Sequence, residues 1–190
     1  DARDQLKQLL TTGNNQVKLV YGKERLDRYR RTLAHLFLPN GQNLQAILLE
    51  QGLATASAFP PNVALTDCYQ QLERLARCKS LGIWSDDDYA TQQSTEIDSN
   101  SKGFHIISGL VERVSESEKG IWLFLQGGLL IGIRTPDLGY FDKHELTLLT
   151  GKNMTVRGWI HPKKKVSKGV KFYMRIRHPS AIAPTTEYVT

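Results

Sequence analysis

The sequence predicts a mixed α+β protein, mainly β with α, that is organised in two parts. In residues 1–86, leucines at helical spacing alternate with short segments of strand-like alternation. A polar, acidic stretch follows at 87–102, and residues 103–178 then show the order strand, strand, strand, helix, strand, strand. We therefore expect one domain at 1–86, a linker at 87–102, a second domain at 103–180 and a tail at 181–190.

The first part is expected to contain three helices and one hairpin. Leucine spacing predicts a helix at 2–10, and apolar alternation predicts strands at 16–21 and 31–38 that pair with each other. A second helix is expected at 43–51, and a third begins at Thr66 or Asp67. Cys68 and Cys78 would lie about 15 Å apart along that third helix. We expect them to be buried free thiols, because this separation is too long for a disulfide.

The segment between the two expected strands holds the first candidate for phosphate contact. Residues 28–31 read Arg-Tyr-Arg-Arg, and strand alternation would place Tyr29 and Arg31 on one side and Arg28 and Arg30 on the other. A guanidinium can hold a phosphate through two parallel hydrogen bonds and stabilise charge that develops on a phosphodiester. The alternative is a solvated charge cluster in which Asp27 pairs with an arginine.

Several short motifs in residues 1–86 occur in an informative order. Asp27-x-Tyr29-x-Arg31-x-Leu33-Ala34 is followed by a strand, Asn40-Gly41, a helix, Gly52-Leu53-Ala54, a helix and Gly82-Ile83-Trp84. This order resembles the C-terminal half of the staphylococcal-nuclease (thermonuclease) family. The resemblance implies part of an OB-type barrel with helices, and a parent protein that hydrolyses phosphodiesters with calcium. One departure is Arg30, which stands where the family has glycine.

The resemblance transfers only one catalytic position, Arg31, to this sequence. The family's two metal-binding aspartates, its other catalytic arginine and its catalytic glutamate have no counterpart here. We therefore assign no metal ligand and no cofactor to this chain and expect it to be inactive as given, with calcium implied for the family alone. A missing N-terminal segment or a partner chain would be needed to complete the first barrel.

The positive charge is concentrated in the second part of the chain. The formal net charge is +6, and residues 100–190 hold 14 basic and 7 acidic side chains. This excess suits an anionic polymer better than a small acidic molecule. No apolar stretch is long enough to cross a membrane, so a membrane partner is not expected.

The second part is predicted to be a five-stranded, OB-fold-like barrel, from the order of its elements. In its last hairpin, alternation places cations and aromatic side chains outward, with lysines in the connecting loop. Such a face suits a single strand of DNA or RNA, whose phosphates pair with cations and whose bases stack on aromatic rings. The alternative is an ordinary solvated face. The candidate binding residues are Arg157, Trp159, Lys163, Lys164, Lys165, Lys171, Tyr173 and Arg175.

These observations favour a nuclease-family protein that binds nucleic acid and lacks its metal-binding half in this chain. Two alternatives remain open: a non-catalytic OB-fold module that binds nucleic acid, and a protein-interaction scaffold whose basic surface meets an acidic partner. The sequence does not distinguish DNA from RNA.

Overall fold

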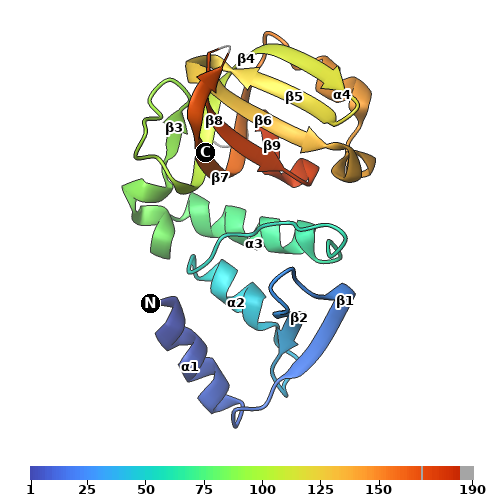
Figure 1. Cartoon of the computed structure of the whole chain (residues 1–190). Helices are drawn as coiled ribbons and strands as arrows, with labels where there is room; N and C mark the ends of the chain where they lie inside the picture. Colours follow the sequence, from blue (N-terminus) through green and yellow to red (C-terminus); the bar gives the residue numbers. More distant parts are fainter. Residues whose placement is uncertain (168, 185–190) are drawn as a thin grey trace. The chain divides into compact units, whose positions relative to one another are not determined.

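The computed structural model describes residues 1–167 and 169–184, and it confirms the mixed α+β class. The chain divides into two compact units, Asp1–Asp87 and Asp88–Thr190 (Figure 1). Most of the tail expected at 181–190 lies outside the described residues. No helix in the described part of the chain is long and apolar enough to cross a membrane.

The first unit contains the three helices and the hairpin predicted from its sequence (Figure 1). The two strands pair in antiparallel fashion, with Lys18 opposite Phe37 and Tyr21 opposite Ala34. The first strand is longer than expected, and the second begins one residue later, at Thr32. In chain order the elements are α1 (Ala2–Thr12), β1 (Lys18–Leu26), β2 (Thr32–Phe37), α2 (Leu44–Glu50), α3 (Thr66–Cys78) and the 3-10 helix η1 (Gly82–Ser85).

Two glycines hold the segments after α2 and α3 in backbone contact. Gly52 and Gly82 have φ angles of +68° and +56°, which favour glycine. The amide of Ile83 donates to the carbonyl of Gly52 at 2.9 Å. A Cβ atom on Gly82 would lie 2.2 Å from that same carbonyl oxygen, so the close approach requires glycine.

The prediction that the two cysteines are buried is wrong, although both are free thiols. Cys68 and Cys78 are both exposed on α3. The buried residues of this helix are Thr66, Glu73 and Ala76, and the carboxylate of Glu73 accepts a hydrogen bond from the amide of Ala56. The helix therefore turns a different face inward, and the cysteines lie off that face.

The second unit has the predicted order of three strands, a helix and two strands. Its main elements are β4 (Gly103–Ser117), β5 (Gly120–Leu125), β6 (Leu129–Arg134), α4 (Lys143–Thr147), β7 (Asn153–Ser167) and β8 (Val170–Ile176). Neighbouring strands run in the order β4-β5-β6-β8-β7, and β7 also pairs with β4. The sheet therefore closes into a ring (Figure 1). All of these pairings are antiparallel except β6 with β8.

The core of the second unit lies inside this ring. Alternate residues of each strand point into it and are fully buried, so the residues between them face outward. The inward residues include Ile121, Leu123 and Leu125 of β5, Ile131 and Ile133 of β6, Val156 and Ile160 of β7, and Phe172, Met174 and Ile176 of β8.

Part of the stretch expected to be a linker belongs to the second unit. Residues Thr91–Gln93 form β3, which pairs in parallel with β4. The amide of Ser94 donates to the carbonyl of Ser108 at 2.7 Å, and Ile97 joins the core with 8% of its surface exposed. The backbone hydrogen bonds of β4 thus recruit a polar segment that has too few apolar residues to fold alone. A further short strand, β9 (Ile182–Pro184), pairs with β7.

Candidate nucleic-acid interface

Asp27 closes the turn between β1 and β2. Its Oδ1 accepts hydrogen bonds from the amides of Tyr29 and Arg31, both at 2.8 Å, and its Oδ2 accepts from Nε of Arg31 at 2.6 Å. Partial desolvation raises the pKa of the Asp27 carboxyl, but the hydrogen bonds from Arg31 and Tyr29 outweigh it and hold the pKa below its ordinary value. The carboxylate is therefore the ionised anchor of this turn.

The expected strand alternation of residues 28–31 is wrong, because these residues form a turn. Arg28 and Arg31 both lie against the ring of Tyr29, with guanidinium carbons 4.6 and 5.3 Å from the ring centroid. The side chain of Arg31 keeps 75% of its surface exposed despite its ion pair with Asp27. The ion pair between Asp27 and an arginine, which was expected for a solvated charge cluster, is thus present. It holds Arg31 in place without burying it.

Arg30 occupies a left-handed backbone position, with φ of +64°. The residues around it are held by Asp27, whose carbonyl accepts from the amide of Arg30 at 2.9 Å. The turn therefore keeps a conformation that suits glycine even though the side chain is arginine. Arg30 therefore carries the strain of a left-handed backbone position.

The described residues offer no ligand set for calcium. In residues 1–167 and 169–184, no group of three or more His, Cys, Asp and Glu side chains is placed to hold a metal ion. Asp27, the carboxylate nearest to Arg31 in sequence, is already engaged by the turn. No step of the chemistry of this chain is therefore assigned to a metal.

The outer face of the ring is basic over four adjacent strands. Within their described bounds, β5, β6, β8 and β7 contain no Asp or Glu. A surface without acidic side chains repels no phosphate and attracts a polyanion. The basic residues of these strands are Arg134, Arg157, Lys163, Lys164, Lys165, Lys171 and Arg175.

An aromatic pair crosses this face above a glycine. Tyr173 of β8 and Trp122 of β5 lie on either side of β6, where Gly132 faces outward because Ile131 and Ile133 point into the core. A Cβ atom on Gly132 would lie 2.7 Å from the hydroxyl oxygen of Tyr173 and 2.8 Å from the ring of Trp122. Because Gly132 of β6 has no side chain, the rings of Trp122 and Tyr173 can approach each other over it from the strands on either side.

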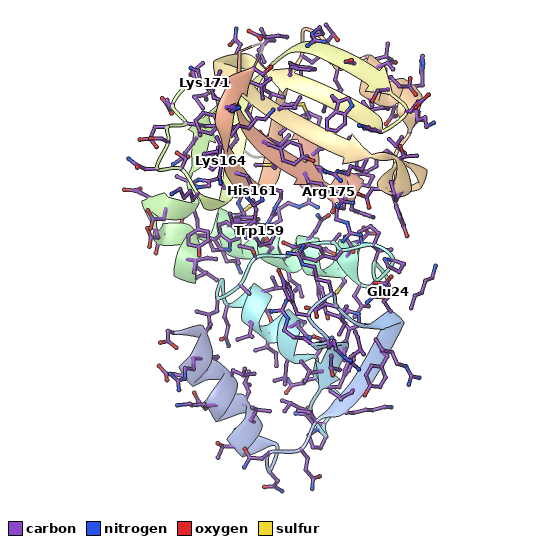
Figure 2. The ribbon with its side chains drawn as sticks, viewed as in Figure 1. Glu24, Trp159, His161, Lys164, Lys171 and Arg175 are labelled. Carbon is purple, nitrogen blue, oxygen red and sulfur yellow. The ribbon has the colours of Figure 1, made fainter. Side chains whose placement is uncertain are left out.

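Figure 2 labels four predicted binding residues on the outer side of the ring: Trp159, Lys164, Lys171 and Arg175. Trp159 is 44% exposed and contacts Phe104 edge to face, with ring centroids 5.4 Å apart. His161 lies opposite Tyr173, so it extends the aromatic row onto β7. The expected connecting loop is wrong for three lysines: β7 continues to Ser167, so Lys163, Lys164 and Lys165 lie within that strand. These three lysines and Lys171 of β8 are all exposed.

Two predicted arginines are not freely exposed. Arg157 is buried, with 6% of its surface exposed, and its guanidinium carbon lies 5.3 Å from the centroid of the Phe104 ring. Alternation correctly predicts that Arg157 points away from the core, but it does not predict what covers a side chain on that side. Arg175 forms an ion pair with Asp137 at 2.6 Å. Neither arginine is therefore equivalent to the solvated lysines.

The contribution of β5 and β6 to this face was not predicted from the sequence. Trp122 is half-buried on the outer face, and Arg113 of β4 lies 3.7 Å above the ring of Phe124. In β5, Trp122 and Phe124 alternate with Ile121, Leu123 and Leu125, and this pattern predicts an outward aromatic face. That β5 and β8 lie on either side of β6 follows only from the ring topology.

Comparison with known proteins bears on the first unit. Residues 1–86 match the family described as staphylococcal nuclease homologue. The chain is 34% identical over 94 residues to the SPbeta prophage-derived endonuclease YokF of Bacillus subtilis, covering 49% of this chain and 31% of that protein. It is also 34% identical over 94 residues to endonuclease YncB of Bacillus subtilis, covering 49% of this chain and 44% of that protein.

A thermonuclease of Staphylococcus intermedius is 37% identical over 71 residues, covering 37% of this chain and 42% of that protein. The chain thus spans less than half the length of these curated relatives. The matched stretch includes the turn with Arg31 and the two contacting glycines. Residues 1–86 of this chain are therefore similar to the family described as staphylococcal nuclease homologue.

Proposed function

We propose that this chain binds single-stranded nucleic acid through the outer face of the ring in its second unit. The observation that carries the proposal is the run of four adjacent strands without an acidic residue, on which lysines flank the aromatic row of Trp122, Tyr173 and Trp159. Phosphates would pair with the lysines, and bases would stack on the rings. A duplex hides its bases, so the exposed ring of Trp159 and the partly exposed rings of Trp122 and Tyr173 favour a single strand.

The arrangement of the second unit supports the interpretation of the ring as an OB-fold-like barrel. The ring has five main strands and a helix, α4, between the third and fourth of them. Small closed barrels of this kind present one strand face and the adjoining loops to oligonucleotides. The hairpin of β7 and β8 would then supply the lysines of such a surface, three of them from β7 and one from β8.

The first unit supports a role in a nuclease, with phosphodiester hydrolysis as the reaction of the whole protein. Its relatives are described as endonucleases and thermonucleases. Arg31 is exposed and oriented by Asp27, which suits a guanidinium that contacts a phosphodiester. We propose that Arg31 has this role when the rest of a catalytic centre, including any calcium, is supplied from outside the described residues.

The salt dependence of binding tests the proposed lysine contacts. Replacing Lys163, Lys164 and Lys165 by Gln should weaken binding of a labelled oligonucleotide regardless of its sequence. The logarithmic salt slope should fall by about 2, because each phosphate contact on a single strand contributes about 0.7. A matched control is the triple change of Lys119, Lys143 and Lys152 to Gln. It removes the same charge outside the four strands and should leave the slope nearly unchanged.

Stacking on Trp159 predicts a different kind of loss. Trp159→Ala should weaken binding by roughly 1–3 kcal/mol if one base stacks on the ring, with little change in the salt slope. Trp159→Phe should retain part of the affinity, since phenylalanine keeps an aromatic face. Undetectable binding by the unaltered chain at low salt would refute the proposal. It would favour the alternative that the basic face meets an acidic protein partner.

A further inference from the structure

A buried carboxylate joins two arginines at the end of β8. Asp137 belongs to the 3-10 helix η4 (Thr135–Tyr140), and its side chain is 2% exposed. Its Oδ2 accepts from Nη2 of Arg175 at 2.6 Å and from Nε of Arg175 at 3.2 Å. Its Oδ1 accepts from Nε of Arg177 at 3.2 Å. Each carboxylate oxygen thus holds one guanidinium.

The carboxylate lies beneath the arginines, and the arginines face solvent. The side chains of Arg175 and Arg177 each keep 37% of their surface exposed, in contrast to 2% for Asp137. Arg175 lies on β8 and Arg177 directly follows it, so the two arginines, two residues apart, share the outward face. The acid therefore orients two cations toward solvent without reaching the surface itself.

A third arginine belongs to the same end of the sheet. Ile133 of β6 lies opposite Ile176 of β8 in the parallel pairing, and the next residues along the two strands are Arg134 and Arg177. Arg134 is exposed. Arg134 therefore adds a third cation beside the two that Asp137 holds.

We propose that Arg175 and Arg177, braced by Asp137, form a binding site for one phosphate group of the nucleic acid. This inference rests on the proposed function of the outer face and adds a second anchor to it, separate from the lysines of the β7–β8 hairpin. Guanidinium groups bind phosphate oxygens through paired hydrogen bonds, and a fixed guanidinium loses less entropy when it does so. The ligand chemistry is a phosphate oxyanion, either within the strand or at its end.

The charge of Asp137 makes the proposal testable against simple electrostatics. Removing an acid from a polyanion-binding face normally raises affinity, because the net charge becomes more positive. If Asp137 positions the arginines, Asp137→Asn should instead lower oligonucleotide affinity in the full chain by about tenfold, the equivalent of one charge-assisted hydrogen bond. Glu116→Gln is the matched control, because Glu116 is an exposed acid on β4 that takes no part in the ion pairs of Asp137 with Arg175 and Arg177. This replacement should raise affinity slightly.

A second pair of variants keeps the charge and changes only the geometry. Arg175→Lys and Arg177→Lys should each lower affinity severalfold, because lysine lacks the planar fork. Arg134→Lys should have a smaller effect, since Arg134 forms no ion pair with Asp137 in the described residues. A thermal melt of each variant identifies any that fail to fold. Because the lysine variants keep the ion-pair charge, they test the site even if Asp137→Asn unfolds.

The outcomes separate the failure of this inference from the failure of the proposed function. If the three hairpin lysines matter but Asp137→Asn binds like Glu116→Gln and both lysine variants bind normally, the ion pair is only a structural brace and the inference is wrong. If the unaltered chain binds no oligonucleotide, both proposals are wrong. Oligonucleotides with and without a 5′-phosphate distinguish the two sources. Dependence on Arg177 for both indicates an internal phosphodiester, and dependence for the phosphorylated strand alone indicates a terminal phosphate.

Discussion

The contact between Gly52 and Gly82 predicts a large loss of stability on Gly82→Ala. A Cβ at this position would lie 2.2 Å from the carbonyl oxygen of Gly52 and 3.0 Å from that of Gln51. Both neighbours are backbone atoms, so no side chain can move aside. The alanine would also have to adopt a φ of +56°, which costs about 1–2 kcal/mol for a non-glycine residue.

Relieving the clash requires the two segments to separate by nearly 1 Å, since real Cβ contacts are not shorter than about 3.0 Å. That movement breaks the hydrogen bond from Ile83 to Gly52, which contributes about 1 kcal/mol. Adding the backbone strain, Gly82→Ala should destabilise the first unit by about 2–3 kcal/mol. Hydrogen exchange of the α3 amides in the full chain, followed by mass spectrometry, measures this loss.

Gly41 provides a matched control in the same unit. Its φ is +85°, but a Cβ there would meet nothing within 4 Å. Gly41→Ala should therefore cost only the backbone strain of about 1–2 kcal/mol. Equal losses for the two variants would show that the close backbone contact contributes nothing and would refute the reasoning.

Three further predictions concern the first unit and the reaction. Arg30→Gly should stabilise the unit by about 0.5–1 kcal/mol in urea unfolding, because it relieves left-handed strain at φ of +64°; Arg30→Ala removes the same charge, keeps the strain and should bring no such gain. Burial lowers the pKa of His35 below 6.5, so the unfolded chain binds more protons and the unit should lose stability as pH falls below about 6.5. His35→Gln should flatten that dependence in unfolding measured from pH 5 to 8. Purified chain with added calcium should not cleave nucleic acid, because the described residues hold no cluster of metal-binding side chains; cleavage abolished by a chelator would contradict this.

Local patterns were enough to identify most helices and strands. The helices α1, α2 and α3 and the strands β4 to β8 follow from spacing and alternation, because a helix or strand must turn its apolar side chains toward one core. The motif order in residues 1–86 was also sufficient to indicate the similarity to the staphylococcal nuclease homologue family. The polar segment around β3 was not identified as a strand, because its pairing depends on hydrogen bonds to β4 and not on its own apolar content.

Two features of the first unit could not be predicted from local sequence patterns. The turn at Asp27 was expected to continue the strand, but one carboxylate accepts three hydrogen bonds and closes it. Such a closure depends on where a side chain folds back, which alternation does not describe. For the same reason, the exposed cysteines of α3 were expected on the buried face. The choice of inward face depends on the neighbours of the helix.

The sequence alone determined the composition of the basic face, since its lysines, arginines and aromatic residues alternate with core residues along each strand. Tertiary structure decided which of them can act together. Ring closure places Trp122 and Tyr173 on either side of Gly132, although they are far apart in sequence. It also brings Asp137 of η4 against Arg175 of β8 and Arg177, which directly follows β8. Alternation determines the side of a strand on which a residue lies. Its neighbours across the sheet are determined by strand order and register, which require contacts between distant segments.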